Sequence, residues 1–231
     1  MSKKKWLYVD IPLMAYEEAR ELQLEIVQAR KHTTFDRNVV LFLEHPSVFT
    51  LGRRGERGHL KVTEAFLKSK GVPIVHVERG GDITYHGHGQ LVVYPIIYLG
   101  KEGLGVKEYV TGLEEVMIRS AGDFGIKSER DPRNRGVWIG NNKLGSIGIA
   151  IRHGISFHGF AFNVNLAMEP FTWINPCGLQ EIGMTSLERE LSGKVPMGEV
   201  RDAVRSHMEN IFRVELELIN LGKLRMLLKE S

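Results

Sequence analysis

The sequence predicts one α+β domain in which a mixed β-sheet is flanked by helices. Helical and strand-like segments follow one another in a mixed order, without the regular alternation that builds a parallel sheet. The 231 residues are 42% hydrophobic, which is enough for a full core, and they lie at the upper end of the usual size of one domain. No repeat or linker divides the sequence, so residues 1–231 are expected to form a single domain.

Three segments have the residue pattern of amphipathic helices. Residues 13–31 place apolar side chains at intervals of three and four among charged ones. Residues 106–121 and 197–212 have a similar pattern, and Thr63 is suited to cap a short helix over 63–70. A short basic helix is expected near the C-terminus. These segments supply the apolar faces that cover a sheet.

The strand predictions rest on short apolar runs that are bounded by turn residues. The clearest run is 39–43, which is followed by Glu44-His45-Pro46. Residues 52–58 are rich in Gly and Arg and are expected to form a loop. The other expected strands are 6–9, 74–77, 91–97, 125–128, 136–139, 143–152, 154–165 and 214–219.

Charge and hydropathy exclude several classes of function. The formal net charge is +3, which falls short of a nucleic-acid-binding surface but permits an acidic protein partner. The densest basic cluster, Arg53, Arg54 and Arg57, is either a solvated loop or part of a docking surface. No run of eighteen apolar residues is present, and the N-terminal segment is unlike an export signal. We therefore expect a cytoplasmic protein that binds neither nucleic acid nor a membrane.

A glycine-rich segment, 79–90, is the first candidate ligand site. Its four glycines allow the backbone to approach a ligand closely, although a turn between strands would also explain them. The segment has neither the ending of a P-loop nor the spacing of a dinucleotide-binding turn, so a phosphate site is disfavoured. His86 and His88 could share one face of a strand, but no third ligand has a recognisable spacing. We expect no metal site.

The single cysteine, Cys177, excludes an internal disulfide and leaves one thiol to be explained. It is either a buried structural residue or a reactive thiol. Lys143 begins an apolar strand rich in small residues, where a charge is costly unless it is exposed or has a partner. Lys143 is therefore either a solvent-facing strand end or a partner of Cys177 that favours its thiolate form.

Several motifs occur in order over most of the chain. They are Glu44-His45-Pro46 with Thr50-Leu51-Gly52-Arg53-Arg54-Gly55, residues 79–86 with Gly89-Gln90-Leu91 and Tyr94-Pro95, Lys143 with Ser146-Ile147-Gly148, His158-Gly159-Phe160-Ala161 with Asn163-Val164, and Pro176-Cys177-Gly178-Leu179 with Thr185-Ser186-Leu187. Together they resemble the lipoyl(octanoyl) transferases. Two positions depart from that family's pattern: His88 replaces its usual proline and Gly145 its common alanine. These departures leave loop geometry and chain-length preference open.

The resemblance implies a fold similar to the catalytic domain of biotin- and lipoate-protein ligases, and a reaction that needs no ATP, metal or cofactor. Cys177 would carry the acyl group as a thioester, with Lys143 as its partner. The residues implied to form the acyl-binding site are Arg79, Gly80, Gly81, Asp82, Ile83, Thr84, Tyr85, His86, Ser146, Ile147, Gly148, Gly159, Phe160 and Ala161.

The resemblance also implies the partners of the reaction, which is the first step of endogenous protein lipoylation. The donor would be octanoyl-acyl carrier protein. The acceptors would be lipoyl domains of 2-oxoacid dehydrogenase E2 subunits and the glycine cleavage H protein. Two alternatives stay open: an ATP-dependent lipoate or biotin ligase, which has no use for a thiol at Cys177, and a non-catalytic protein that binds acyl groups or lipoyl domains.

Overall fold

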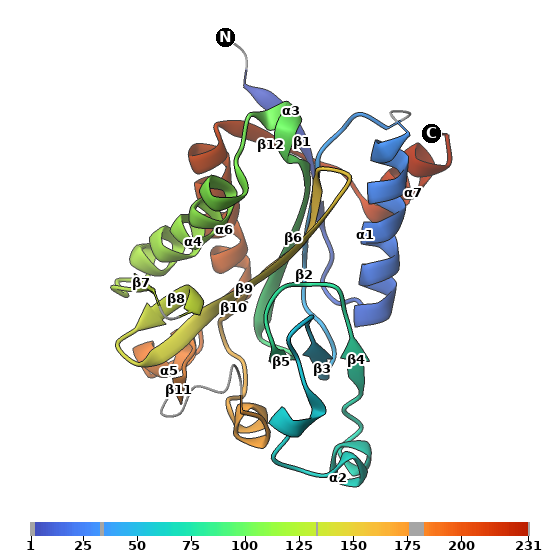
Figure 1. The fold of residues 1–231 in the computed structure, drawn as a ribbon. Helices are drawn as coiled ribbons and strands as arrows, with labels where there is room; N and C mark the ends of the chain where they lie inside the picture. Colours follow the sequence, from blue (N-terminus) through green and yellow to red (C-terminus); the bar gives the residue numbers. More distant parts are fainter. Residues whose placement is uncertain (1–2, 33–34, 133, 176–182, 231) are drawn as a thin grey trace.

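The computed structural model describes residues 3–32, 35–132, 134–175 and 183–230 (Figure 1). The described strands form a large mixed sheet and a small one. The predicted α+β class, with a mixed sheet flanked by helices, is confirmed. The large sheet has the order β12 (Val214–Leu218), β1 (Lys4–Asp10), β2 (Val39–Leu43), β6 (Gln90–Tyr98), β10 (Ile155–Asn163), β9 (Asn142–Arg152), β8 (Asn134–Ile139) and β7 (Glu129–Asp131), with β11 (Gly183–Met184) paired to β9.

Helices cover both faces of the large sheet (Figure 1). α4 (Val106–Asp123) and α6 (Met197–Phe212) pack on one face, and α1 (Tyr16–Lys31) and α7 (Leu221–Lys229) pack on the other. In the described residues, none of the helices combines the length and the apolar character that a membrane crossing requires. The remaining helices are short: α2 (Glu64–Ser69), α3 (Leu99–Glu102), α5 (Leu187–Leu191), and the 3-10 turns η1 (Arg57–His59) and η2 (Glu169–Trp173).

The central strand β6 divides the core into two layers because its side chains alternate between the faces of the sheet. Leu91 and Val93 belong to the cluster beneath α4 and α6. Val92 and Tyr94 belong to the cluster beneath α1. The strand is therefore apolar on both sides, which explains why it appears in the sequence as a continuous apolar run.

Helix α1 begins later than the predicted range 13–31. The backbone N–H of Ile11 donates a 2.8 Å hydrogen bond to the carbonyl of Phe42, and that of Met14 donates a 3.0 Å bond to the carbonyl of Glu44. These bonds hold the chain before α1 against the end of β2. Tertiary pairing therefore overrides the helical pattern at this end.

The expected strand 125–128 is wrong. Gly125 has φ +77 and lies in the turn that follows α4, so the chain reaches the sheet only at β7. Glycine tolerates this left-handed conformation without steric cost.

The small sheet was not predicted as a unit. It has the order β4 (Ile74–His76), β3 (Val48–Leu51) and β5 (Ile83–His86). β4 corresponds to the expected strand 74–77, but β5 lies inside the glycine-rich segment. β3 and β5 pair antiparallel although they are far apart in the sequence. Pairing between such distant segments leaves no signal in the local sequence pattern. The small sheet packs with η2 around Phe49 and Phe171.

Candidate active site

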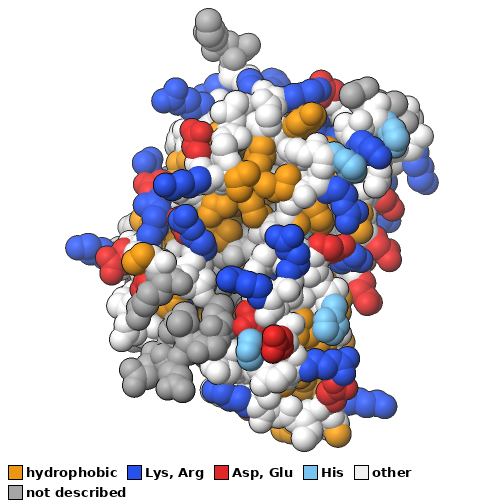
Figure 2. Space-filling view, in the orientation of Figure 1, with side chains coloured by type: hydrophobic (Ala, Val, Ile, Leu, Met, Phe, Trp, Pro, Cys, Tyr) orange, Lys and Arg blue, Asp and Glu red, His pale blue; other side chains and the backbone are white. Residues whose placement is uncertain are grey.

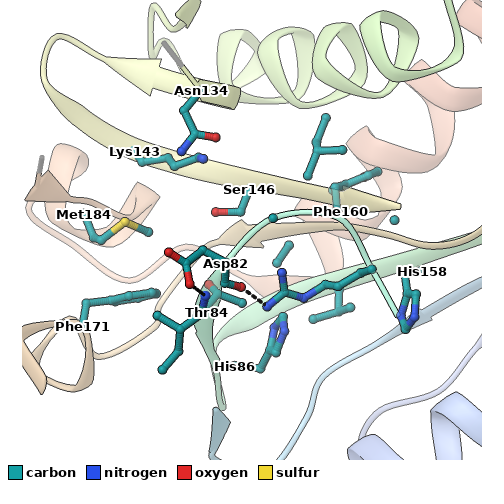
Figure 3. Close-up of a pocket in the computed structure, with 18 of the residues that line it drawn as sticks. Asp82, Thr84, His86, Asn134, Lys143, Ser146, His158, Phe160, Phe171 and Met184 are labelled. Atoms are coloured by element: carbon teal, nitrogen blue, oxygen red, sulfur yellow. Dashed lines mark hydrogen bonds between the residues drawn. The ribbon is translucent and has the colours of Figure 1, made fainter. Parts of the chain in front are cut away.

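A pocket lies where β5 and the loop before it face β9 and β10 of the large sheet (Figure 3). It encloses about 770 Å³, counted together with its opening to solvent. In the antiparallel register of β9 and β10, Ser146 lies opposite Ala161 and Gly148 lies opposite Gly159. Both glycines line the pocket, and a Cβ at Gly148 would lie 2.9 Å from the Gly80 carbonyl oxygen, so the glycine lets the pocket loop approach β9 closely.

Most of the residues predicted to bind the acyl group line this pocket. They are Arg79, Gly81, Asp82, Ile83, Thr84 and His86 from the loop and β5, and Ser146, Ile147, Gly148, Gly159, Phe160 and Ala161 from β9 and β10. Gly80 and Tyr85 are not among the lining residues. The Gly80 N–H donates a 2.9 Å bond to the Ile149 carbonyl beside the pocket. The Tyr85 ring packs against Phe171 in the small core.

Lys143 lies at the mouth of the pocket and is only 8% exposed. It is therefore not a solvent-facing strand end. Its Nζ lies 5.0 Å from the centroid of the Trp138 ring, which is within the range of a cation–π contact. Gly136, at φ +133, makes room for this side chain, because a Cβ there would lie 2.6 Å from Lys143 Cε.

Cys177 lies outside the described residues, but both flanks of segment 176–182 are described. On one side, the Asn175 N–H donates a 2.7 Å bond to the carbonyl of His59. The His59 ring pairs at 2.7 Å with Asp82, which lines the pocket. On the other side, Met184 lines the pocket and pairs with Lys143 through β11. The residue after this segment, Met184, therefore belongs to the pocket wall, and the residue before it, Asn175, is linked to the wall through His59 and Asp82.

Arg79 fixes the wall of the pocket that comes from the glycine-rich loop. Its guanidinium donates 2.8 Å bonds to the carbonyls of Thr50 and Asp82. Its aliphatic stem lies against Gly148, where a Cβ would come within 3.0 Å of Arg79 Cδ. The guanidinium of Arg79 therefore stabilises the loop, whereas the methylene groups of the Arg79 side chain pack against β9.

The inner end of the pocket, away from Lys143, is polar (Figure 3). Tyr94 shares a 2.8 Å hydrogen bond with His45 Nε2, and His86 Nδ1 shares a 2.7 Å bond with Gln90 Oε1. Burial holds the pKa of both His86 and His158 below the ordinary histidine value. Burial also raises the pKa of Tyr94 well above its ordinary value. These side chains are therefore uncharged near neutral pH.

His86 and His88 are the two histidines whose spacing in the sequence could have suggested a metal site. β5 ends at His86, which is buried, whereas His88 lies exposed in the following turn. The two side chains therefore do not share a strand face. Among the described residues, no group of three or more His, Cys, Asp or Glu side chains is arranged to hold a metal ion.

The sequence did not identify every residue of the pocket. Residues from α1, β8 and η2 reach it only through tertiary packing, so no local pattern marks them. His158 and Tyr94 belong to two of the family motifs, His158-Gly159-Phe160-Ala161 and Tyr94-Pro95, and those motifs are the sequence signal for them. The lining residues missed in this way are Tyr16, Val92, Tyr94, Asn134, Trp138, His158, Phe171 and Met184.

Basic side chains occur on the surface near the pocket. Arg53 and Arg54 are exposed, and the backbone N–H of Arg54 donates a 3.1 Å bond to the Gly81 carbonyl of the pocket loop. Figure 2 shows Lys and Arg side chains across the middle of this face, close to a patch of hydrophobic side chains. An acidic partner would find complementary charge here.

Comparisons with known proteins agree with these features. Residues 15–209 match the family described as "Lipoyl protein ligase A/B catalytic domain". An octanoyltransferase of Desulfotalea psychrophila is 50% identical over 206 residues, covering 88% of this chain and 92% of that protein. An octanoyltransferase of Syntrophobacter fumaroxidans is 40% identical, covering 98% of this chain and 99% of that protein.

A solved structure shares the fold. The crystal structure of lipoate-protein ligase A bound with ATP has a TM-score of 0.73 at 15% identity, covering 100% of this chain and 94% of that one. At this identity the likeness concerns the fold alone, whereas the sequence relatives decide the family. The chain belongs to the lipoyl protein ligase A/B catalytic-domain family and, within it, to the octanoyltransferases.

Proposed function

We propose that this octanoyltransferase carries the octanoyl group as a thioester on Cys177 and passes it to a lysine of a lipoyl domain. Lys143 would handle the charge and the protons of both steps. The observation that carries the proposal is a buried lysine that lines a pocket together with the apolar side chains Ile147, Phe160 and Ala161. Burying a charge is costly, so its presence beside a pocket supports a chemical role. The described flanks of segment 176–182 support Cys177 as its partner.

In the first step, the Cys177 thiolate attacks the carbonyl carbon of the donor thioester. A new thioester bond forms on Cys177, the bond to the donor sulfur breaks, and the donor leaves as a thiol after taking up a proton. An ammonium group on Lys143 favours the attacking thiolate. Because one thioester replaces another, this step needs no ATP.

In the second step, the amine of the acceptor lysine attacks the thioester on Cys177. An amide bond forms, the carbon–sulfur bond breaks, and the Cys177 sulfur leaves. In its neutral form, the Lys143 amine can accept the proton that the attacking amine loses. An amide is more stable than a thioester, so this step drives the whole transfer.

The middle of the pocket suits the alkyl tail of the acyl group. Ile147, Phe160 and Ala161 present apolar surface there, together with the glycines of β9 and β10. Burying the seven carbons beyond the carbonyl is worth roughly 5 kcal/mol at about 0.8 kcal/mol per methylene. This energy supports the assignment of these residues, with Arg79, Asp82, Thr84 and His86, to acyl binding.

The specific partners and the location belong to the same proposal. We propose octanoyl-acyl carrier protein as the donor, because acyl carrier proteins are acidic and Arg53 and Arg54 are exposed near the pocket. We propose lipoyl domains of 2-oxoacid dehydrogenase E2 subunits and the glycine cleavage H protein as acceptors. A thiol that must stay free at Cys177 fits a reducing compartment, which supports the cytoplasm.

Intact-protein mass spectrometry tests the mechanism. After mixing with octanoyl-acyl carrier protein, the wild-type protein should gain one octanoyl group, and hydroxylamine should remove it as it removes other thioesters. Cys177→Ser should lose transfer to a lipoyl domain. ATP-dependent transfer that survives Cys177→Ser would identify a ligase instead. Binding of the donor without any gain in mass would identify a non-catalytic binder.

A further inference from the structure

A groove on the surface meets the acyl pocket at the end that holds Lys143. One side of the groove is formed by Arg54 and the pocket loop, and the other by Asn134 and Arg135 of β8. Five residues line both the groove and the pocket: Gly81, Asp82, Asn134, Ile147 and Gly148. Figure 3 shows the Asn134 and Lys143 side chains at the same end of the pocket. The groove and the pocket therefore meet close to Lys143.

The groove forms where β8 stops accompanying β9. In the described residues, the pairing of the two strands extends only to Ser146, whereas β9 continues beyond it. There the pocket loop takes the place of β8, and the Gly80 N–H donates a 2.9 Å bond to the Ile149 carbonyl. Ile147 and Ile149 also line the groove, together with Val110 of α4. Apolar side chains between two stretches of backbone suit a ligand that alternates methylene and amide groups.

Two arginines line the groove, one on each side. Arg54 is exposed, and its N–H donates a 3.1 Å bond to the Gly81 carbonyl, which holds its backbone beside the groove. The Arg135 side chain is 55% exposed, although its Nη1 lies 3.5 Å from a carboxylate oxygen of Glu114. Guanidinium groups bind phosphate oxygens through charge-assisted hydrogen bonds. The two arginines therefore favour a ligand that carries a phosphate.

Two acidic residues also line the groove. Asp82 is 7% exposed, and its carboxylate pairs with His59 at 2.7 Å. Asp131 is half-buried on the side of β8. A carboxylate near a phosphate weakens its binding, so Asp131→Asn should strengthen it.

We propose that the groove binds the phosphopantetheine arm of the donor, with its phosphate at Arg54 and Arg135 and its thioester beside Lys143. Acyl carrier proteins hold their acyl group on this arm, which joins methylene and amide groups to a dimethyl-substituted carbon and a phosphate. The apolar side chains of the groove suit the methyl and methylene groups. The lysine of the acceptor is positively charged, so two arginines do not favour its entry here. The inference rests on the proposed function, because it concerns the donor of the same reaction.

The length of the arm fits the distance that it has to span. Gly136 pairs with Ser146, which follows Lys143 by three residues on β9, and Arg135 is one position further away. At about 3.3 Å per residue, Arg135 and Lys143 are roughly 13 Å apart along the sheet. About thirteen bonds separate the sulfur of the arm from its phosphorus, and at about 1.25 Å per bond they extend to roughly 16 Å. The arm can therefore reach both residues at once.

The experiment compares two small donors that differ by one phosphate, octanoyl-pantetheine and octanoyl-4′-phosphopantetheine. The measurement is the second-order rate constant for the gain of one octanoyl group, followed by intact-protein mass spectrometry. We expect the wild-type protein to prefer the phosphorylated donor at least about tenfold, because two guanidinium groups contact the phosphate. In Arg54→Gln/Arg135→Gln, the preference should shrink to about twofold or less, and each single variant should be intermediate.

Arg119→Gln is the matched control. Arg119 is an exposed arginine of α4 that pairs with Glu115 at 2.8 Å, and its side chain is 52% exposed, close to the value for Arg135. It does not line the groove. The same loss of charge there should leave the preference for the phosphorylated donor as in the wild type. Thermal melting shows whether each variant folds.

The outcomes separate this inference from the proposed function. Equal rate constants for the two small donors in the wild-type protein overturn the phosphate site, whatever the variants do. A folded Arg54→Gln/Arg135→Gln protein that keeps the full preference overturns it as well, and so does an equal loss in Arg119→Gln. If octanoyl-acyl carrier protein does not acylate the wild-type protein at all, the proposed function has failed.

Discussion

The backbone N–H of Thr185 donates a 3.0 Å hydrogen bond to the carbonyl oxygen of Lys143. The Thr185 carbonyl in turn accepts a 2.9 Å bond from the Asn163 side chain, whose oxygen accepts a 2.9 Å bond from Gln90. Gln90 is bonded to His86 at 2.7 Å. A continuous network therefore joins the mouth of the pocket to its inner end. The strand that carries Lys143 and the chain that follows segment 176–182 are held together.

Replacing Lys143 should separate the two steps of the reaction. Lys143→Ala should slow both acylation of Cys177 and transfer, by at least about a hundredfold, because general acid–base catalysis commonly contributes this much. Lys143→Arg keeps a positive charge but cannot accept a proton, so acylation should be slowed less than transfer. Single-turnover mass spectrometry measures each step. Wild-type rates in Lys143→Ala would refute the role, and Lys107→Ala, an exposed lysine on α4, is the control.

Gly136→Ala should displace the Lys143 side chain. A Cβ at Gly136 would lie 2.6 Å from Lys143 Cε and closer still to the Gly145 carbonyl, so one of these must move. We expect kcat/KM to fall at least about tenfold, as misplaced catalytic groups commonly lose this much. Gly140→Ala is the control, because Gly140 also has positive φ but has open space around its Cβ position. Equal activity in the two variants would contradict the contact.

Ala161→Leu should shift the chain-length preference toward shorter acyl groups. Ala161 lines the middle of the pocket and is 6% exposed, so a larger side chain takes space from the tail. Overfilling of this kind costs about 1 to 3 kcal/mol, and kcat/KM for octanoyl relative to butanoyl donors should fall about tenfold. Ala150→Leu, on β9 but outside the pocket lining, should keep the wild-type ratio. Uniform loss with all donors in Ala161→Leu would indicate general damage to the fold.

Stability should decrease as pH falls from about 6.5 to about 4. Burial lowers the pKa of His45 to about 4, from an ordinary value of 6.5. In this window the unfolded chain takes up a proton that the folded protein excludes, so acid favours unfolding. The full effect of His45 is about 3 kcal/mol in the free energy of unfolding, measured by denaturant titration at several pH values.

A variant checks the source of this pH dependence. His45→Gln should reduce the dependence between pH 6.5 and 4, although it also weakens the bond to Tyr94 at every pH. A smaller slope should remain, because burial also lowers the pKa of His86 and His158. His76→Gln, an exposed position on β4, should leave the slope unchanged. The assignment fails if His45→Gln has the slope of the wild-type protein.

Salt should slow transfer from an acidic donor. Screening weakens the attraction between the donor and the exposed Arg53 and Arg54, so kcat/KM should fall as ionic strength rises. The double variant Arg53→Gln/Arg54→Gln should be slower at low salt and less sensitive to added salt. Arg225→Gln, on α7 where Arg225 pairs with Glu18, should behave like the wild type. A wild-type rate that does not depend on salt would refute this docking surface.

Much of the fold was predictable because its signals are local. The apolar spacing of α1, α4 and α6 and the continuous apolar runs of β2 and β6 express which faces each element buries. Thr63 caps α2 as predicted, through a 3.2 Å bond from the Phe66 N–H. The small sheet was not predictable, because β5 obtains its partner β3 from a distant part of the chain.

The sequence by itself determined the fold class, the family motifs and the candidates Lys143 and Cys177, because these depend on residue types and their order along the chain. Only the tertiary structure decided that Lys143 is buried beside Trp138 and that Tyr16 and Tyr94 close the pocket. It alone brought Arg54 and Arg135 to the two sides of one groove. The physical reason is that burial and hydrogen bonding depend on contacts between distant segments, which local patterns do not contain.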